Sequence, residues 1–162
     1  MSQTDPTTYG FDLEVAQAGQ KYDLSYDQVD SFAAEGAVPF GVAVVAGTDP
    51  NQQVALVETA SDVFRGIALF THTREQGFNR AATPASTGAQ YLDTETVSVL
   101  SRGRVWVKAS GNVTAGALAY ADLATTFNDS FTVTSTDNLK VGRFHTSGSD
   151  GELVVLEVDK AA

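Results

Sequence analysis

Residues 96–109, TVSVLSRGRVWVKA, alternate between apolar and polar side chains almost without interruption. Successive side chains of a β-strand point to opposite faces, so a period of two predicts one buried face and one exposed face. The buried face would carry the odd positions, Val97, Val99, Val105 and Val107. This stretch therefore commits the chain to β-structure packed on a core.

Two arrangements preserve that alternation. A hairpin with a three-residue loop at residues 101–103 would pair Val99 with Val105 and place Gly103 at the loop position that needs a positive φ. A single long strand bent at Gly103 keeps the same faces. We favour the hairpin.

The exposed face of this stretch carries an aromatic residue among bases. Trp106 stands there with Arg102, Arg104 and Lys108, which are three of the ten basic residues in the chain. An aromatic centre within a charged rim is typical of protein interfaces. We expect this face to contact a second copy or a partner, and burial of Trp106 in the core is the alternative.

Short β-rich runs continue along the chain and are separated by glycines and turn-forming residues. They cover residues 41–47, 54–57, 63–69, 117–121, 131–135, 140–144 and 153–158. A chain of 162 residues that is 43% hydrophobic and 19% charged is typical of one globular domain. We therefore expect an all-β fold, a single β-sandwich or jelly-roll-like domain over residues 35–162.

A weak internal repeat runs through this region. Residues 36–46 and 111–121 share the pattern Gly-x-Val-x-x-Gly-x-x-x-[Val/Tyr]-Ala. A second matching pair follows about 30 residues later, around Gly66 and Gly142. We interpret the two copies as related β-units, and independent reuse of glycine turns is the alternative.

Residues 1–34 precede the predicted domain, and we interpret them as an extended N-terminal arm. The first 24 residues are polar with scattered aromatics, Tyr9, Phe11 and Tyr22. The aromatics favour an arm that orders against a partner over a partly ordered terminus. Residues 25–36 fit a helical turn or an extended strand equally well.

A second candidate contact segment is the long stretch at residues 71–95, which is small and polar in composition. Loops of this length inside a compact domain are usually functional or disordered. Arg74 and Arg80, with His72, give it a basic character on an otherwise acidic chain. A mobile surface loop is the alternative.

The sequence favours no catalytic, metal-binding or cofactor chemistry. The net charge of −10 opposes binding to nucleic acid, and the longest apolar run, VAVVA, is too short to span a bilayer. The chain has no Cys, and its two histidines, His72 and His145, fall at equivalent points of the repeat, which favours a structural position over a metal or catalytic pair. We expect no enzyme, no cofactor and no metal, and no direct contact with membrane or nucleic acid.

Four segments together resemble the structural cement, or decoration, proteins of tailed-bacteriophage capsids: EGAVPFGVAVV, VFRGIAL, DTETVSVLSRGRVWVKASGNVTAGALAY and GELVVLEV. They occur in the order of that family's motifs and cover roughly residues 35–158. Val38 stands where the family more often has Ile. The stretch at residues 71–95 has no counterpart that we can match.

The resemblance implies a non-enzymatic virion protein that is assembled in the host cytoplasm. It would bind the major capsid protein on the outer capsid surface, bridge neighbouring capsomers, and often act as a homodimer at two-fold or local two-fold positions. We expect three contact regions: the arm with Tyr9, Phe11 and Tyr22, then the stretch with Arg74 and Arg80, then the Trp106 face. A tail or baseplate module and a carbohydrate-binding jelly roll are the alternatives.

Overall fold

The computed structural model describes residues 16–24, 26–71, 90–125 and 129–159. These residues form strands, turns and loops without a helix, which confirms the predicted all-β class. The strands are β1 (Gln28–Ala34), β2 (Val38–Pro39), β3 (Ala43–Ala46), β4 (Gln53–Leu56), β5 (Phe64–Ala68), β6 (Gln90–Tyr91), β7 (Thr96–Ala109), β8 (Leu118–Ala121), β9 (Ser130–Thr132), β10 (Leu139–Phe144) and β11 (Leu153–Asp159).

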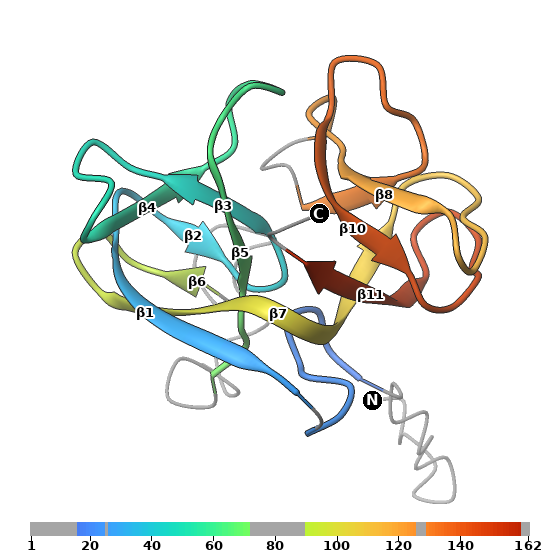
Figure 1. The fold of residues 1–162 in the computed structure, drawn as a ribbon, viewed down its shortest axis with the longest axis horizontal. Coiled ribbons are helices and arrows are strands. Elements are labelled where there is room, and N and C mark those ends of the chain that lie inside the picture. The colour runs from blue at the N-terminus through green and yellow to red at the C-terminus, as the bar shows by residue number, and fades with distance from the viewer. Residues whose placement is uncertain (1–15, 25, 72–89, 126–128, 160–162) are drawn as a thin grey trace, which may run out of the picture.

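Nine of these strands form one sheet that closes on itself twice. Strands β1-β4-β3-β5-β7 form a first ring, which the β1–β7 pairing closes. Strands β7-β11-β10-β8-β9 form a second ring, which the β7–β9 pairing closes. The two rings share β7, and Figure 1 shows them as two lobes with β7 running along both. Closure leaves few free sheet edges.

The predicted hairpin at residues 101–103 is wrong, because β7 continues through it as one strand of 14 residues. Its first half pairs with β1 and its second half with β11, so Val99 lies opposite Asp30 and Val105 opposite Leu156. Alternation alone could not separate the two arrangements, since both keep the same faces. The predicted buried face is confirmed: Val97, Val99, Val105 and Val107 are each 0% exposed.

The buried apolar side chains form two cores, one within the first ring and a larger one that fills the second ring and reaches the first. Val44, Val54 and Val99 belong to the core of the first ring. Ala43 and Val45 point from the other face of β3 into a larger core shared with the second ring. This two-sided burial explains the unbroken apolar run of β3, because a strand covered on both faces has no polar side.

The internal repeat has a structural counterpart in the turns that begin each copy. The Gly36 amide donates to the Asp93 carboxylate at 2.9 Å, and the Gly111 amide donates to Asp150 at 2.8 Å. The residues two positions before these glycines match as well. The amide of Ala34 donates to the carbonyl of Glu95, and that of Ala109 to the carbonyl of Glu152, both at 2.8 Å.

The second glycine of each copy is also used in the same way. The Gly41 amide donates to the carbonyl of Ala68 at 2.8 Å, and the Gly116 amide donates to that of Phe144 at 2.7 Å. The pairings correspond too: β1–β4 and β7–β9 are the two parallel pairs of the sheet, at matching places in the two rings. The halves are therefore related β-units, as the glycine pattern indicated.

Part of the predicted arm lies within the sheet. Residues 28–34 form β1, so the ambiguous segment is extended and belongs to the first ring. Residues 1–15, with Tyr9 and Phe11, lie outside the described residues. The division into an arm of residues 1–34 and a domain of residues 35–162 stays a prediction.

The stretch at residues 71–95 is described only at its ends. Gln90 and Tyr91 form β6, which pairs with β2, and the buried Tyr91 hydroxyl donates to the Leu69 carbonyl at 2.7 Å. Burial raises the pKa of this phenol. His72, Arg74 and Arg80 lie outside the described residues.

Candidate binding surface

The chain segment that precedes β1 pairs with one edge of β7, beside Trp106. The Gly19 amide donates to the Trp106 carbonyl at 2.8 Å, and the Trp106 amide donates to the backbone carbonyl of Gln20 at 2.9 Å. The Tyr22 amide donates to the Arg104 carbonyl at 3.0 Å. Residues 19–22 thus run as a short antiparallel extension along one edge of β7.

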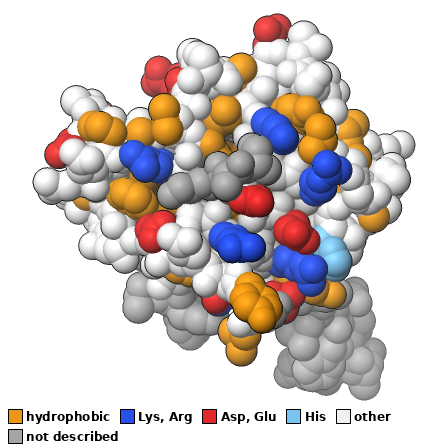
Figure 2. All heavy atoms as spheres, viewed as in Figure 1, with side chains coloured by type: hydrophobic (Ala, Val, Ile, Leu, Met, Phe, Trp, Pro, Cys, Tyr) orange, Lys and Arg blue, Asp and Glu red, His pale blue; other side chains and the backbone are white. Residues whose placement is uncertain are grey.

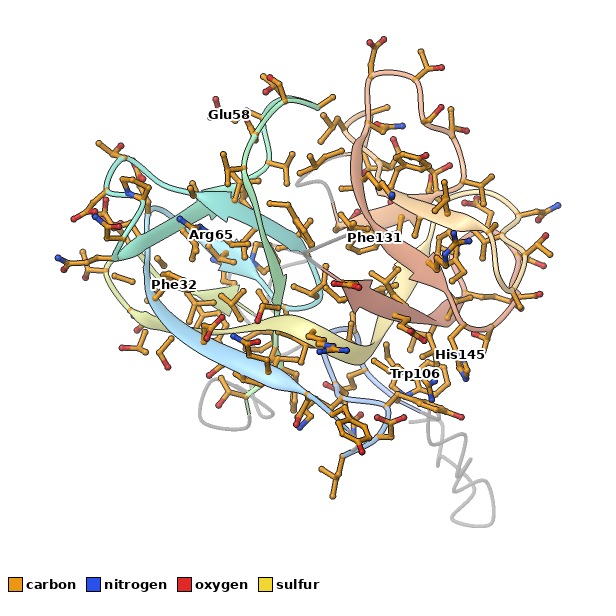
Figure 3. All side chains as sticks on the ribbon, viewed as in Figure 1. Phe32, Glu58, Arg65, Trp106, Phe131 and His145 are labelled. Atoms are coloured by element: carbon orange, nitrogen blue, oxygen red, sulfur yellow. The ribbon has the colours of Figure 1, made fainter. Side chains whose placement is uncertain are left out.

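These bonds bring three rings together. Tyr22 meets Trp106 edge-on, with ring centroids 5.6 Å apart and planes at 68°. The Tyr22 ring also lies near the His145 ring, with centroids 5.8 Å apart. Figure 3 shows Trp106 and His145 close to the beginning of β11, where Trp106 pairs with Val155. Trp106 is half-buried, so it lies neither in the core nor fully at the surface.

The basic residues of this face lie beside acids. Arg104 contacts Asp23 at 3.2 Å and Glu157 at 3.3 Å, and Lys108 lies 3.7 Å from Asp129. The hydrogen bond to Glu157 is the main cause that raises the pKa of Arg104. Figure 2 shows blue and red side chains alternating over this face. The surface around Trp106 is therefore mixed in charge.

An exposed apolar strip continues from Tyr22 toward β1. We define it by four side chains and their exposed fractions: Tyr22 44%, Leu24 88%, Tyr26 92% and Val29 43%. An ion pair between Lys21 and Asp27 ties together the two ends of the loop that bears Leu24 and Tyr26. In Figure 2, hydrophobic side chains gather at the lower edge of the molecule.

The structure joins two regions that the sequence presented separately. Tyr22 was expected to act with the arm and Trp106 with the β7 face, and their rings are in contact. The sequence does not predict Leu24, Tyr26 and Val29 as contact residues. A signal existed in the alternation of Tyr22, Leu24 and Tyr26 with polar residues, but the run is short.

No group of three or more His, Cys, Asp and Glu side chains in the described ranges is arranged to hold a metal ion. Across the same ranges, no helix is long and apolar enough to cross a membrane.

Comparison with known proteins gives two findings. The family model described as structural cement protein (E217 gp24/Pam3 gp6) matches residues 5–159. A chain from the solved capsid of Myoviridae phage XM1 has the same fold, with a TM-score of 0.67, 17% sequence identity, and coverage of 90% of this chain and 91% of that chain. No curated protein matches the sequence.

The family match extends from residue 5 to residue 159 of 162, well beyond the roughly 35–158 covered by the motifs alone. It includes both rings, the apolar strip and most of the segment before residue 16. The chain therefore belongs to the structural cement proteins of bacteriophage capsids.

Proposed function

We propose that this protein binds the outer surface of the major capsid protein lattice as a homodimer, bridges neighbouring capsomers and stabilises the mature, DNA-filled head. The role is mechanical and involves no catalysis. The observation that carries the proposal is the cement-family match over residues 5–159. A fold of two closed β-rings suits such a role, because a rigid body transmits force between the sites that it joins.

The apolar strip is our candidate for the central capsid contact. Leu24 and Tyr26 are exposed by 88% and 92%, which leaves two large side chains in water. Burying a side chain of this size contributes about 1.5–3 kcal/mol, and Tyr is enriched among residues that dominate binding. The mixed-charge surface around Trp106 would form the polar rim of that contact.

The strip is also held in place before any partner binds. Residues 19–22 are bonded to β7, and the Lys21–Asp27 ion pair closes the loop. A preformed contact loses less conformational entropy on binding. Many copies, each with moderate affinity, would then reinforce the lattice together through avidity.

The long-range electrostatics favour a basic partner surface. The chain carries a net charge of −10, so copies on one capsid repel each other and are attracted to Lys- and Arg-rich patches. We retain Arg74 and Arg80 as proposed capsid contacts, together with the arm residues Tyr9 and Phe11. Arg102 and Lys108, both exposed on the Trp106 face, belong to the same proposal.

Co-sedimentation with expanded capsids that lack the protein tests this function. We expect binding at a fixed stoichiometry, and at least a tenfold loss of affinity in a Leu24→Ala/Tyr26→Ala double variant. The matched control is Val63→Ala, because Val63 is 63% exposed but lies away from the strip, in the turn before β5. Equal binding by the double variant and the control would remove the strip from the proposal, and no binding by the native protein would remove the function.

A test of the arm's role requires a truncation that leaves the sheet intact. Removing residues 1–24 would also remove the bonds between residues 19–22 and β7, so loss of binding could follow from loss of structure. Deleting residues 1–15 leaves every described contact in place. We expect this shorter variant to fold normally and bind capsids more weakly, and full-strength binding would refute a role for the arm.

A further inference from the structure

Each ring contains a four-residue turn directly before one of its strands. LDTE at residues 92–95 precedes β7 in the first ring, and SDGE at residues 149–152 precedes β11 in the second. The aspartate of each turn accepts the amide of the first glycine of its copy, as described above. The glutamate of each turn accepts the amide of the turn's own first residue, at 2.8 Å in the first ring and 2.7 Å in the second.

The third residue has the same place in both turns. The Thr94 amide donates to the carbonyl of Ala34 at 2.9 Å. The Gly151 amide donates to the carbonyl of Ala109, also at 2.9 Å. The φ angles agree as well, at +67° for Thr94 and +80° for Gly151. The two turns therefore share one conformation, and the second ring forms it without the leucine and the threonine that the first ring has.

Threonine is an unfavourable residue at this φ. The left-handed region favours glycine, and a β-branched residue there is an outlier. An added Cβ at Gly151 would meet nothing within 4 Å, so the turn has room for a side chain and only the backbone conformation opposes one. Thr94 is exposed, so burial of its side chain does not offset the strain. Strain that the fold does not require is typical of residues that serve a function.

A second departure from the glycine-containing turn lies two residues earlier. Leu92 is 49% exposed, whereas the second ring has the polar Ser149 at this place. Tyr26, in the apolar strip, also combines a positive φ of +46° with an exposed side chain. Tyr26 precedes β1, and Thr94 is bonded to Ala34 at the end of β1. Strained residues with exposed side chains therefore lie at both ends of this strand.

The surroundings of the 92–95 turn are acidic. Glu35 and Asp93 are exposed, and Glu95 adds a third carboxylate. Hydrogen bonds from Thr48 lower the pKa of Glu35 and the charge of Asp93 opposes that shift, so these two carboxylates lie close together. Such a surface attracts Lys and Arg side chains. A second copy is a poor partner, because an isologous contact would bring the same acids together.

We propose that the 92–95 turn is a further capsid contact, where Leu92 and Thr94 bind a Lys- or Arg-bearing surface of the major capsid protein. The inference rests on the proposed function and adds a contact site to it. The turn and the apolar strip lie at opposite ends of β1, and the five residues from Val29 to Ala34 span about 17 Å. One copy would thus contact the lattice at two separate points, as bridging requires.

Exchange of residues between the two turns tests this contact. Thr94→Gly should raise the melting temperature by about 2–4 °C, because it removes the strain of one left-handed residue. Leu92→Ser/Thr94→Gly gives the first ring the turn of the second, and it should fold because the same four residues already form this turn at 149–152. We expect its affinity for expanded capsids in co-sedimentation to fall roughly tenfold. A purely structural turn would not gain stability from Thr94→Gly and lose binding through the same two positions.

Gly151→Thr makes the reverse change in the second ring and serves as the matched control. It should lower the melting temperature by about 2–4 °C and leave capsid binding unchanged. Equal capsid affinity of the native protein and Leu92→Ser/Thr94→Gly would overturn this inference and leave the proposed function intact. A lower melting temperature in Thr94→Gly would also overturn it, because the threonine would then support the fold. If the native protein binds no capsids, the proposed function fails and the inference fails with it.

Discussion

Gly19→Ala probes how the segment before β1 is fixed on the sheet. Gly19 has φ = +85°, and a Cβ added there would lie 2.8 Å from the Gly41 nitrogen and 2.9 Å from the Phe70 nitrogen. Both neighbours are main-chain atoms of the first ring, so neither can move aside at low cost. Either the sheet is strained or residues 19–22 detach from β7.

The expected cost follows from two separate contributions. An Ala held at positive φ costs about 1–2 kcal/mol relative to Gly. Forcing a methyl group into a packed site adds about 1–3 kcal/mol. Gly36→Ala is the matched control, because Gly36 has φ = +84° but an added Cβ meets nothing within 4 Å. We expect a loss of about 1–2 kcal/mol for Gly36→Ala and about 2–5 kcal/mol for Gly19→Ala.

Urea unfolding followed by circular dichroism measures both losses. Trp106 is the one tryptophan of the chain and contacts Tyr22, so its fluorescence reports detachment of the segment directly. We expect a fluorescence shift under native conditions in Gly19→Ala and none in Gly36→Ala. Equal stability losses in the two variants, with unchanged fluorescence in both, would refute the close packing of Gly19 against the first ring.

Three further substitutions test the fold. Phe131→Ala should cost about 3–5 kcal/mol in chemical unfolding, because the side chain is 0% exposed in the larger core; a loss below about 1 kcal/mol would contradict that burial. Tyr91→Phe should cost about 1–2 kcal/mol, because it leaves the buried Leu69 carbonyl without its donor; an unchanged unfolding midpoint would mean that water replaces the hydroxyl. Hydrogen bonds from the Thr48 side chain and amide lower the pKa of Glu35 from its ordinary value of 4.5. A lowered folded pKa stabilises the fold above the unfolded pKa and is lost as the pH falls through the folded one. The melting-temperature advantage of the native protein over Glu35→Gln should therefore be constant above about pH 4.5 and shrink below it, and an advantage that grows on acidification would reverse the sign.

The class of the fold, and which face of its longest strand is buried, can be predicted from the sequence. Alternation in residues 96–109 is a local property, so it survives any pairing and predicts the buried valines correctly. Whether the stretch turns back at Gly103 depends on its partners β1 and β11, which lie far away in the chain. Those pairings are decided by tertiary structure, which a local pattern cannot contain.

The internal repeat, too, can be predicted from the sequence only in part. Its glycines are visible in the sequence because their spacing is conserved between the two copies. The acids that complete each turn, Asp93 and Asp150, follow the first glycines after 57 and 39 residues, so no fixed period links them. The closing turns become recognisable as equivalent only once both rings are in view.

Only part of the candidate surface could be predicted from the sequence. Tyr22 and Trp106 were singled out, but their contact joins residues 84 positions apart and depends on the pairing of residues 19–22 with β7. Leu24 and Tyr26 lie in too short a run for a pattern to emphasise them. Tyr9, Phe11, Arg74 and Arg80 stay predictions, since the described residues do not include them.

Calorimetry of expanded capsids, with and without saturating protein, tests the central claim most directly. If the protein is a capsid cement, the temperature at which capsids rupture rises with occupancy and reaches a plateau when the sites are full. The Leu24→Ala/Tyr26→Ala variant should require a higher concentration to reach the same plateau, and Val63→Ala should match the native protein. A rupture temperature that stays unchanged at saturation would contradict the account.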